Sequence, residues 1–257
     1  MQWRMKIQGM ALLQGISDVI FPPICVHCRA MVEAPCANAT TLERGFRHLC
    51  ERCAAQLEFV RPPHCTTCGH PFYGVVEGER MCIKCEGLEP AFRHGRTAVL
   101  FKGPARSLVI ELKYHRGLHV LADMAEIFRR SRELIASVCD AILVPVPLHQ
   151  RKFRDRGYNQ AALLATALAT AAGGETRIEP LLQRVVDTTT QTAFDRRTRM
   201  ANLKNAFALA PASALTPALH YILVDDVFTT GSTLNSCARA LRRAGALRLD
   251  VVTFGHG

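Results

Sequence analysis

The sequence Tyr221-Ile-Leu-Val-Asp-Asp-Val-Phe-Thr-Thr-Gly-Ser-Thr233 decides the fold of this 257-residue chain. Its first four residues are apolar, which is typical of a parallel strand covered on both faces, where strict alternation is not expected. We expect that strand to end at Asp225. Beyond Thr233, apolar residues recur at helical spacing, namely Leu234, Cys237, Ala238 and Leu241. The sequence therefore predicts a strand, a turn and a helix in order, which is the repeating unit of an α/β sheet.

The turn between this strand and helix has the composition of a phosphate site. Hydroxyl side chains, the glycine at 231 and the backbone N–H groups of a helix N-terminus bind phosphate, helped by the helix dipole. The two acids before the turn would repel a phosphate, so we expect Asp225 and Asp226 to face sugar hydroxyls or a bound cation. A 5-phosphorylated ribose carries both kinds of group.

This segment resembles the binding motif for 5-phosphoribosyl-1-pyrophosphate (PRPP) in the type I phosphoribosyltransferases. The resemblance implies that Asp225 and Asp226 hold the ribose. It places the 5-phosphate against Thr229, Thr230, Gly231, Ser232 and Thr233, and it includes Val227 in the PRPP site. A Walker-B-like strand or a plain strand–turn–helix is the alternative. The chain has no GxxxxGK[ST] motif for a P-loop and no GxGxxG motif for a dinucleotide site.

Composition allows one medium domain and a smaller appendage, since 49% of the residues are hydrophobic. The formal charge of +10 suits polyanions, but phosphate-binding enzymes also need cations, so charge indicates nucleic acid only weakly. Leu12, Leu13, Ile16, Val19 and Ile20 fall at helical spacing and predict a short amphipathic helix, with neither a signal peptide nor a membrane span. We therefore expect a cytoplasmic protein with no membrane partner.

Eight of the eleven cysteines form four CxxC pairs in the first third of the chain. Each pair brings two thiolates to one metal, and two pairs complete the tetrahedral set that structural zinc prefers. Sequential pairing predicts two zinc sites, one from Cys25, Cys28, Cys50 and Cys53 and the other from Cys65, Cys68, Cys82 and Cys85. Crossed pairing is the alternative.

Other chemistry is open to these cysteines. Iron–sulfur ligation fits the ligands, whereas a disulfide framework lacks a secretory signal and thioredoxin-like chemistry needs a single CxxC at a helix start. Nearby side chains could replace a named ligand, although we expect them to be bystanders, namely Cys36, His48 and His64. Cys139 and Cys237 fall among apolar residues and are predicted to lie in the core.

After Pro90 the cysteine pairs stop and helices alternate with strands, so we expect domains at 1–90 and 91–257. A strand is predicted over Gly95–Phe101 and a helix over Pro104–His115, with Lys113 near its end, where a cation suits the carbonyls or could reach a phosphate. A longer helix is predicted through Leu121 to Ile135.

A buried strand is predicted over Ala141–Pro147, followed by a basic loop over residues 149–157. Ligands bind at the carboxyl edge of an open α/β sheet, and guanidinium groups match pyrophosphate oxygens. The predicted pyrophosphate ligands are Arg151, Arg154 and Arg156, with Lys152 and His149 beside them. A solvated basic loop is the alternative.

Asn159 is predicted to cap an alanine- and leucine-rich helix that ends before Gly173-Gly174. The polar segment Thr188–Phe207 is predicted to be a mobile loop. By resemblance, it stands where phosphoribosyltransferases have a loop that closes over the reaction centre, which makes Arg199 a catalytic candidate. An ordinary connector is the alternative.

Taken together, these motifs resemble the ComF family. They are the cysteine-rich N-terminal region, the VPVP strand, RxRGYNQ, the segment from Gln191 to Phe207, and LVDDVFTTGST. The resemblance spans Phe21 to Phe254. It implies an α/β fold, a type I phosphoribosyltransferase-like parallel sheet flanked by helices, with a small N-terminal double zinc-ribbon domain. It also implies a link to DNA uptake in competent bacteria.

Two function classes follow from the resemblance. The first is a protein that binds PRPP, or a related ribose 5-phosphate, with Mg²⁺ and transfers or senses the 5-phosphoribosyl group, using Asp225, Asp226 and Arg199 at the reaction centre. The acceptor is open. The second is a non-catalytic accessory protein of DNA uptake, in which the ribbons dock a partner ATPase or helicase, or single-stranded DNA. Single-stranded DNA is the less favoured of these partners, because proteins that bind it stack its bases on aromatic side chains and only 7% of the residues here are aromatic.

Overall fold

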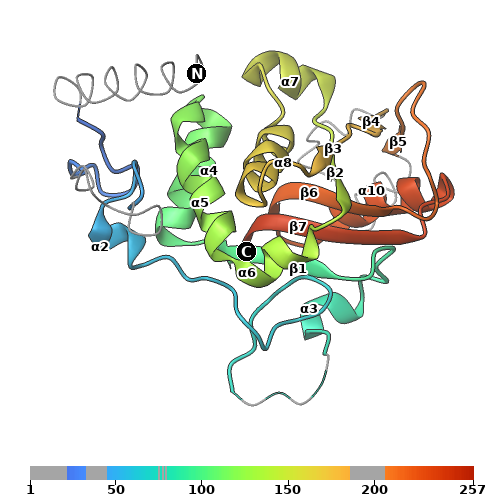
Figure 1. Cartoon of the computed structure of the whole chain (residues 1–257), viewed down its shortest axis with the longest axis horizontal. Coiled ribbons are helices and arrows are strands. Elements are labelled where there is room, and N and C mark those ends of the chain that lie inside the picture. Colours follow the sequence, from blue (N-terminus) through green and yellow to red (C-terminus); the bar gives the residue numbers. More distant parts are fainter. Residues whose placement is uncertain (1–21, 33–44, 75, 77, 79, 186–205) are drawn as a thin grey trace, which may run out of the picture.

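The computed structural model describes residues 22–32, 45–74, 76, 78, 80–185 and 206–257 (Figure 1). Its helices are α2 (Glu51–Ala54), α3 (Ile83–Glu86), α4 (Gly103–Tyr114), the 3-10 turn η1 (Leu118–Val120), α5 (Leu121–Arg130), α6 (Arg132–Ser137), α7 (Gln150–Arg156), α8 (Gln160–Ala171) and α10 (Ser232–Arg243). Its strands are β1 (Gly95–Leu100), β2 (Ala141–Pro145), β3 (Arg177–Ile178), β4 (Leu182–Arg184), β5 (Phe207–Leu209), β6 (His220–Phe228) and β7 (Arg248–His256).

The main sheet has five strands in the order β1-β7-β6-β2-β3, and all of its neighbours are parallel. Helices α5 and α8 pack together, α8 lies against β6 and β2, and α10 contacts β6 and the small antiparallel β4–β5 sheet. The predicted α/β class, a parallel sheet flanked by helices, is confirmed. Strand β6 lies in the middle of the sheet, so its carboxyl end is surrounded by elements from most of the chain.

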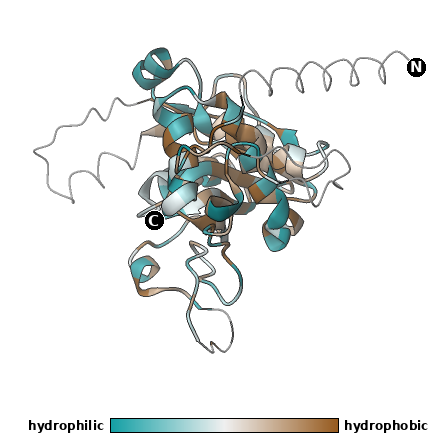
Figure 2. Cartoon of the chain, turned by 90° about the vertical axis from the view of Figure 1, so that its left-hand side faces the viewer, coloured by the Kyte–Doolittle hydropathy of each residue, from teal (hydrophilic) through white to brown (hydrophobic). Residues whose placement is uncertain are grey.

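Residues Tyr221–Val224 are all buried, as a strand covered on both faces requires. Alternate residues serve different cores, because successive side chains of a strand point to opposite faces. Ile222 and Val224 belong to the core with α4, α5 and α8, whereas Tyr221 and Leu223 belong to the core with α10. Figure 2 shows the hydrophobic residues gathered along these central strands, with hydrophilic residues toward the outside.

Strand β6 is longer than the sequence predicts. It was expected to end at Asp225, but it continues to Phe228 because β7 offers partners over its whole length, with Asp225 opposite Thr253 and Phe228 opposite His256. On its other side, β2 pairs with β6 only as far as Pro145 opposite Val224. Among the strands that the structure describes, the last four residues of β6 therefore have a neighbour on one side only.

The long helix predicted through Leu121 to Ile135 is wrong, because it is broken into α5 and α6. Ser131 between them has φ −89° and ψ 72°, outside the helical region. Its hydroxyl group donates to the Ile127 carbonyl at 3.0 Å, so the side chain satisfies a backbone group where the helix is interrupted. The break changes the direction of the chain between Arg130 and Arg132.

The basic loop predicted over residues 149–157 is also wrong, because most of it is the helix α7. The His149 imidazole accepts from the Arg151 N–H at 3.2 Å, and Gly157 ends the helix in the left-handed region at φ 86°. The predicted cap of α8 is confirmed, since the Asn159 side chain accepts from the Ala161 N–H at 3.0 Å.

The cysteine-rich part is attached to the sheet edge and to α5. The Leu100 N–H donates to the Glu58 carbonyl and the Val60 N–H to the Ala98 carbonyl, each at 2.9 Å, so this segment runs along β1. On α5, the buried Asp123 accepts from the backbone N–H groups of Arg47 and His48 at 2.8 and 2.7 Å. These contacts fix both cysteine-rich halves against the α/β body.

Further along, the backbone of the second CxxC region contacts Gly95 at the start of β1. The Gly95 N–H donates to the Thr66 carbonyl at 2.8 Å, and a Cβ at position 95 would lie 2.0 Å from the Thr67 oxygen. Only glycine permits this approach. The Thr97 hydroxyl then donates to the Cys68 carbonyl at 3.1 Å, which continues the attachment.

Several predictions lie outside the described residues, namely the amphipathic helix before residue 22, Cys36, Arg199 and the loop over 188–205. The end of that predicted loop is described, and Phe207 there begins β5. Across the part of the chain that the structure describes, no helix has the length and apolar character needed to cross a bilayer.

Candidate functional site

The eight paired cysteines form two separate clusters. Cys25, Cys28, Cys50 and Cys53 make the first, and Cys65, Cys68, Cys82 and Cys85 make the second. Within each, all sulfur atoms lie within 4.8 Å of one another. The predicted sequential pairing is therefore confirmed and crossed pairing is wrong. His48 and His64 belong to neither cluster, as expected of bystanders.

The sulfur positions fit zinc. A tetrahedral site with bonds of about 2.3 Å places its sulfur atoms about 3.8 Å apart. Cys28 and Cys50 have their sulfur atoms 3.6 Å apart, and Cys68 and Cys82 have theirs 3.7 Å apart. Hydrogen bonding between the two thiols lowers the pKa of Cys65 and raises the pKa of Cys68, so Cys65 is the more readily ionised of the two. Four thiols support structural zinc in each cluster.

The other two cysteines predicted to lie in the core behave differently. Cys237 is buried in α10, as expected. The prediction for Cys139 is wrong, because it is exposed after α6, where the turn at Asp140 leads into β2. Its apolar neighbours enter the core and its own side chain does not.

The two predicted acids lie near the carboxyl end of β6, just past the last residue paired with β2. Asp226 shares the face of Ile222 and Val224, and Asp225 shares that of Tyr221 and Leu223, because side chains alternate along a strand. The position of Asp225 on the α10 side agrees with the raised pKa of Cys237 on α10. Burial is the larger cause of that rise, and the charge of Asp225 is the next. The acids therefore lie next to each other in the chain but face different helices.

Asp226 is buried and forms an ion pair with Lys113 from the end of α4, with Nζ 2.8 Å from Oδ2. Both side chains are largely removed from water, with exposed fractions of 23% for Lys113 and 7% for Asp226. The sequence left two roles open for Lys113, a cation that suits the carbonyls at the helix end or a phosphate ligand. Its partner is more than a hundred positions away, so no local pattern could identify it.

Asp225 is held differently. Burial raises the pKa of its carboxyl group to about 8, and the neighbouring charge of Asp226 acts in the same direction. The Asp226 N–H donates to Asp225 Oδ1 at 2.9 Å, which opposes the rise. Near neutral pH this carboxyl group is therefore largely protonated and able to donate a hydrogen bond, whereas the Asp226 carboxylate is paired with an ammonium group.

This donor set does not fit a magnesium ion held by the protein itself. Mg²⁺ prefers octahedral oxygen ligands and free carboxylates. Asp225 holds a proton near neutral pH, Asp226 is paired with Lys113, and the two point to different faces. The predicted magnesium ion would have to be carried by phosphate groups of a ligand.

The turn after β6 is built around Gly231. It has φ +70°, and a Cβ there would lie 2.6 Å from the Phe228 ring and 3.0 Å from Leu88. The Thr230 and Ser232 hydroxyl oxygens lie 3.0 Å apart, and Thr229 and Thr230 are exposed. The twelve-residue helix α10 starts at Ser232, so its first N–H groups lie beside these hydroxyls.

Asn235, in the first turns of α10, ties this helix to the segment that follows the second cysteine cluster. Its side chain accepts from the Ala91 N–H at 2.8 Å and donates to the Leu88 and Glu89 carbonyls at 2.9 and 3.2 Å. Sequence reasoning missed this residue, because a single asparagine in an amphipathic helix gives no signal of a long-range contact. It fixes the start of the helix relative to the rest of the chain.

The predicted pyrophosphate ligands lie on α7. Arg151 and Arg154 are exposed, and Arg156 is half-buried with its guanidinium carbon 5.9 Å from the centre of the Tyr114 ring. Arg116 donates to the Asp155 carbonyl at 3.4 Å. The end of α4 therefore contacts both α7 and, through Lys113, β6, which gathers the cations and the acid at one edge of the sheet.

Curated relatives resemble this chain over most of its length. Competence protein F of Haemophilus influenzae is 30% identical over 88% of this chain and 94% of that protein. DNA utilization protein YhgH of Salmonella typhimurium is 33% identical over 80% of this chain and 88% of its own. Competence protein ComFC of Bacillus subtilis is 23% identical over 86% and 90%.

Residues 16–86 match the double zinc ribbon domain family, and this range contains both cysteine clusters. Among solved structures, a hypoxanthine phosphoribosyltransferase of Staphylococcus aureus is 13% identical and covers 53% of this chain and 62% of its own, with a TM-score of 0.33. That TM-score is too low to support a shared ligand. The length and identity of the competence relatives are decisive, and they show that this chain belongs to the ComF family.

Proposed function

We propose that this protein serves the uptake or utilisation of DNA, and that the carboxyl edge of its sheet binds a 5-phosphorylated ribose. The first part is supported by relatives named for competence and for DNA utilization that match most of the chain. The second part is carried by one observation: the hydroxyl-rich turn at Gly231 lies between the acids of β6 and the N-terminus of α10.

Each element of this edge has a part in binding. The N–H groups and hydroxyls of Ser232 and Thr233 would hold the 5-phosphate, aided by the dipole of α10. The Asp226 carboxylate, fixed by Lys113, would accept from a ribose hydroxyl. The cations Arg151, Arg154 and Arg156 of α7 would neutralise a pyrophosphate group, as expected for PRPP.

The same arrangement would also support transfer of the 5-phosphoribosyl group from PRPP to an acceptor. The C1–oxygen bond to pyrophosphate would break, a nucleophile would bond to C1 and release its proton, and pyrophosphate would leave with both bonding electrons. The protein would contribute positioning and charge rather than a covalent nucleophile. Release of pyrophosphate from PRPP, assayed with candidate nitrogen nucleophiles, measures this step separately from binding.

Calorimetric titration of the zinc-loaded full chain with PRPP tests the ligand. We expect binding that falls at least about tenfold in Asp226→Asn, because one charged acceptor is lost. Glu175→Gln, which removes an exposed carboxylate elsewhere, is the matched control and should bind as the parent does. The ligand assignment fails if the parent does not bind PRPP or if both variants bind equally.

The role in DNA is tested by complementation. A Haemophilus influenzae strain lacking competence protein F should regain transformation when it expresses this chain, and the Asp226→Asn variant separates the role of the ligand from that of the scaffold. Full complementation by that variant would leave the DNA role standing without the ligand. No complementation by the parent chain, despite normal expression, would count against the DNA role.

A second candidate role is docking of a partner through the zinc ribbons. Large apolar side chains are exposed around both cysteine clusters, including Met31 at 70%, Tyr73 at 82% and Ile83 at 86%. Such residues are typical of the buried centre of a protein interface. Crosslinking of the full chain to an ATPase of DNA uptake should be lost in Tyr73→Ser/Ile83→Ser and kept in Leu247→Ser, an exposed apolar residue far along the chain.

A further inference from the structure

A cleft that is separate from the sheet edge described above lies where the cysteine-rich part meets the broken helix α5–α6. It has a volume of about 620 Å³, within the roughly 300–1,000 Å³ of sites for small molecules. Three segments line it, namely residues 59–64, the start of β1 and residues 129–134. In Figure 1 the first of these segments passes below α6 on its way to the second cysteine cluster.

Positive charge dominates this cleft. Five arginines line it and come from all three segments: Arg61, Arg96, Arg129, Arg130 and Arg132. Two carboxylates oppose them, Glu133 in the lining and Glu126, which pairs with Arg129 and Arg130. Arg61 and Arg132 form no ion pair with any residue that the structure describes. Much of the arginine charge is therefore available to an anion.

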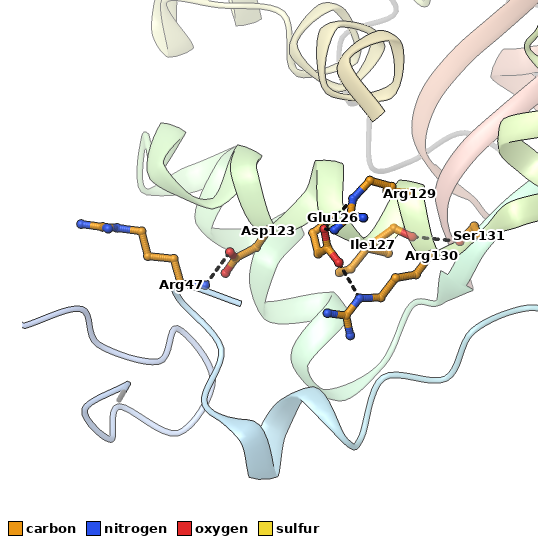
Figure 3. A network of polar contacts seen from close by, with 7 residues as sticks. All are labelled: Arg47, Asp123, Glu126, Ile127, Arg129, Arg130 and Ser131. Atoms are coloured by element: carbon orange, nitrogen blue, oxygen red, sulfur yellow. Dashed lines mark hydrogen bonds and ion pairs between the residues drawn. The ribbon is translucent and has the colours of Figure 1, made fainter. Parts of the chain in front are cut away.

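The arginines of α5 are held in place before any ligand arrives. Arg129 and Arg130 both donate to Glu126, the latter at 2.7 Å, and Figure 3 shows Glu126 between them. The Arg130 guanidinium carbon also lies 4.5 Å from the centre of the Phe46 ring, from the first ribbon. Guanidinium groups fixed in this way lose little freedom on binding an anion.

The break at Ser131 creates the site. Had the helix continued, residues 129–132 would have spread around a single cylinder, about 100° apart. Instead, α5 ends and α6 restarts beside the cleft, which places three arginines on one wall. Across the opening, His64 lies 3.6 Å from Glu133, so the ribbon side is tied to α6.

Apolar residues supply another part of the wall, namely Phe59, Val60, Pro62 and Leu134. A ring-shaped group could pack against them while its charged end meets the arginines. A phosphate chain concentrates several negative charges in a short length, as this cluster of arginines requires, whereas the carboxylates of an acidic peptide are spread along its backbone. The combination of an apolar wall with converging guanidiniums fits a nucleoside with a phosphate chain.

We propose that this arginine-lined cleft is a binding site for a nucleoside diphosphate or triphosphate, distinct from the site at the carboxyl edge of the sheet. The phosphate chain meets Arg61, Arg130 and Arg132, and the base or sugar packs against Phe59 and Pro62. Because the cleft joins the ribbon region to the α/β body, its ligand contacts both parts of the molecule at once.

Calorimetry of the zinc-loaded full chain with ADP tests the proposal. We expect binding that weakens at least about tenfold in Arg61→Gln/Arg132→Gln, because two charge-assisted contacts are lost. Arg177→Gln/Arg248→Gln removes the same charge from exposed positions elsewhere and should bind as the parent does. In the Asp226→Asn background, where the ribose site is weakened, the ADP binding that depends on Arg61 and Arg132 should remain, so failure here is distinguishable from failure of the ribose site.

Four results would overturn the proposal. One is no binding at millimolar ADP, and another is equal loss in the two arginine pairs, which would indicate general charge attraction. The third is inorganic pyrophosphate binding as tightly as ADP, since the apolar wall would then contribute nothing. The fourth is an oligo(dT) strand that needs Arg61 and Arg132 when ADP does not bind, which would make the cleft a single-strand site.

Discussion

Lys113 at the end of α4 and Asp226 near the end of β6 form an ion pair of 2.8 Å that is largely shielded from water. Among the described elements, four α-helices (α5 to α8) and four strands (β2 to β5) lie between α4 and β6 in the chain. The pair joins the helix layer to the candidate ligand edge, so it serves stability and site geometry together.

Replacing one member of this pair should be costly. Lys113→Gln leaves the buried Asp226 carboxylate without its cation, and because Lys113 keeps some contact with water we expect a loss of about 1–3 kcal/mol in the free energy of unfolding. Urea denaturation measures it. Lys102→Gln, which removes the cation of the exposed pair with Glu58, should change stability by less than about 1 kcal/mol. Equal effects would contradict the buried role of Lys113.

The Asp225 carboxyl group should make stability depend on pH. Its pKa is about 8 in the folded protein and 3.8 as the ordinary value, so between those limits the folded state binds more protons than the unfolded state. Stability should therefore fall as pH rises through this window. Asp225→Asn should lack that fall and be more stable than the parent above about pH 8, by more than about 1 kcal/mol.

Thermal unfolding at a series of pH values measures this difference. Glu175→Gln is the control, because an exposed carboxylate should leave the shape of the profile unchanged. A parent profile that rises from acid to alkaline pH, with Asp225→Asn parallel to it, would mean that Asp225 is ionised in the folded protein.

Gly231→Ala should damage the turn before α10. The new Cβ would have to adopt φ +70° and would lie 2.6 Å from the Phe228 ring. Gly174→Ala is a matched control, since Gly174 also has positive φ, +84°, but its Cβ would meet no atom within 4 Å. Both variants should lose about 1 kcal/mol from backbone strain, and only Gly231→Ala should lose more from the clash. Affinity for PRPP should fall in that variant alone.

Metal content should be two zinc ions per chain, one for each cysteine cluster. Elemental analysis of purified protein measures it, and Cys25→Ser should reduce the content to about one. Cys139→Ser changes an exposed cysteine outside both clusters and should keep two. Iron in place of zinc, or no change in Cys25→Ser, would contradict the assignment. Removal of metal by a strong chelator should expose the cysteine-rich part to protease.

Gly95→Ala should loosen the second cysteine cluster from the sheet, because the added Cβ would lie 2.0 Å from the backbone oxygen of Thr67. We expect faster proteolysis between residues 60 and 95 and a loss of stability above about 1 kcal/mol. Gly87→Ala adds a methyl group where no atom lies within 4 Å and should behave as the parent. Unchanged proteolysis in Gly95→Ala would show that this contact is unimportant.

The features that the sequence could predict are those encoded over short distances. Four consecutive apolar residues identify β6, CxxC spacing identifies the thiol clusters, and Asn159 identifies the start of α8. In each case a residue type performs its role through neighbours a few positions away. The same is true of Gly231, whose positive φ is a local requirement of the turn.

The features that the sequence could not predict depend on distant partners. The end of β6 is set by β7, and the charge state of Asp225 depends on its burial in the folded protein and on the neighbouring charge of Asp226. The break at Ser131 interrupts a regular apolar pattern, and it produces the arginine-lined cleft only together with residues 59–64. Arg199, the predicted catalytic arginine, lies outside the described residues and stays a prediction.

At the carboxyl edge of the sheet, β6 extends further than its neighbour β2. Past Val224 the central strand continues through Asp225 to Phe228 beyond its last pair with β2, and β7 is its neighbour there among the described strands. A ligand could therefore approach this end of β6 from the side of β2. Access to the acids of this edge would then depend on the difference in length between the two strands.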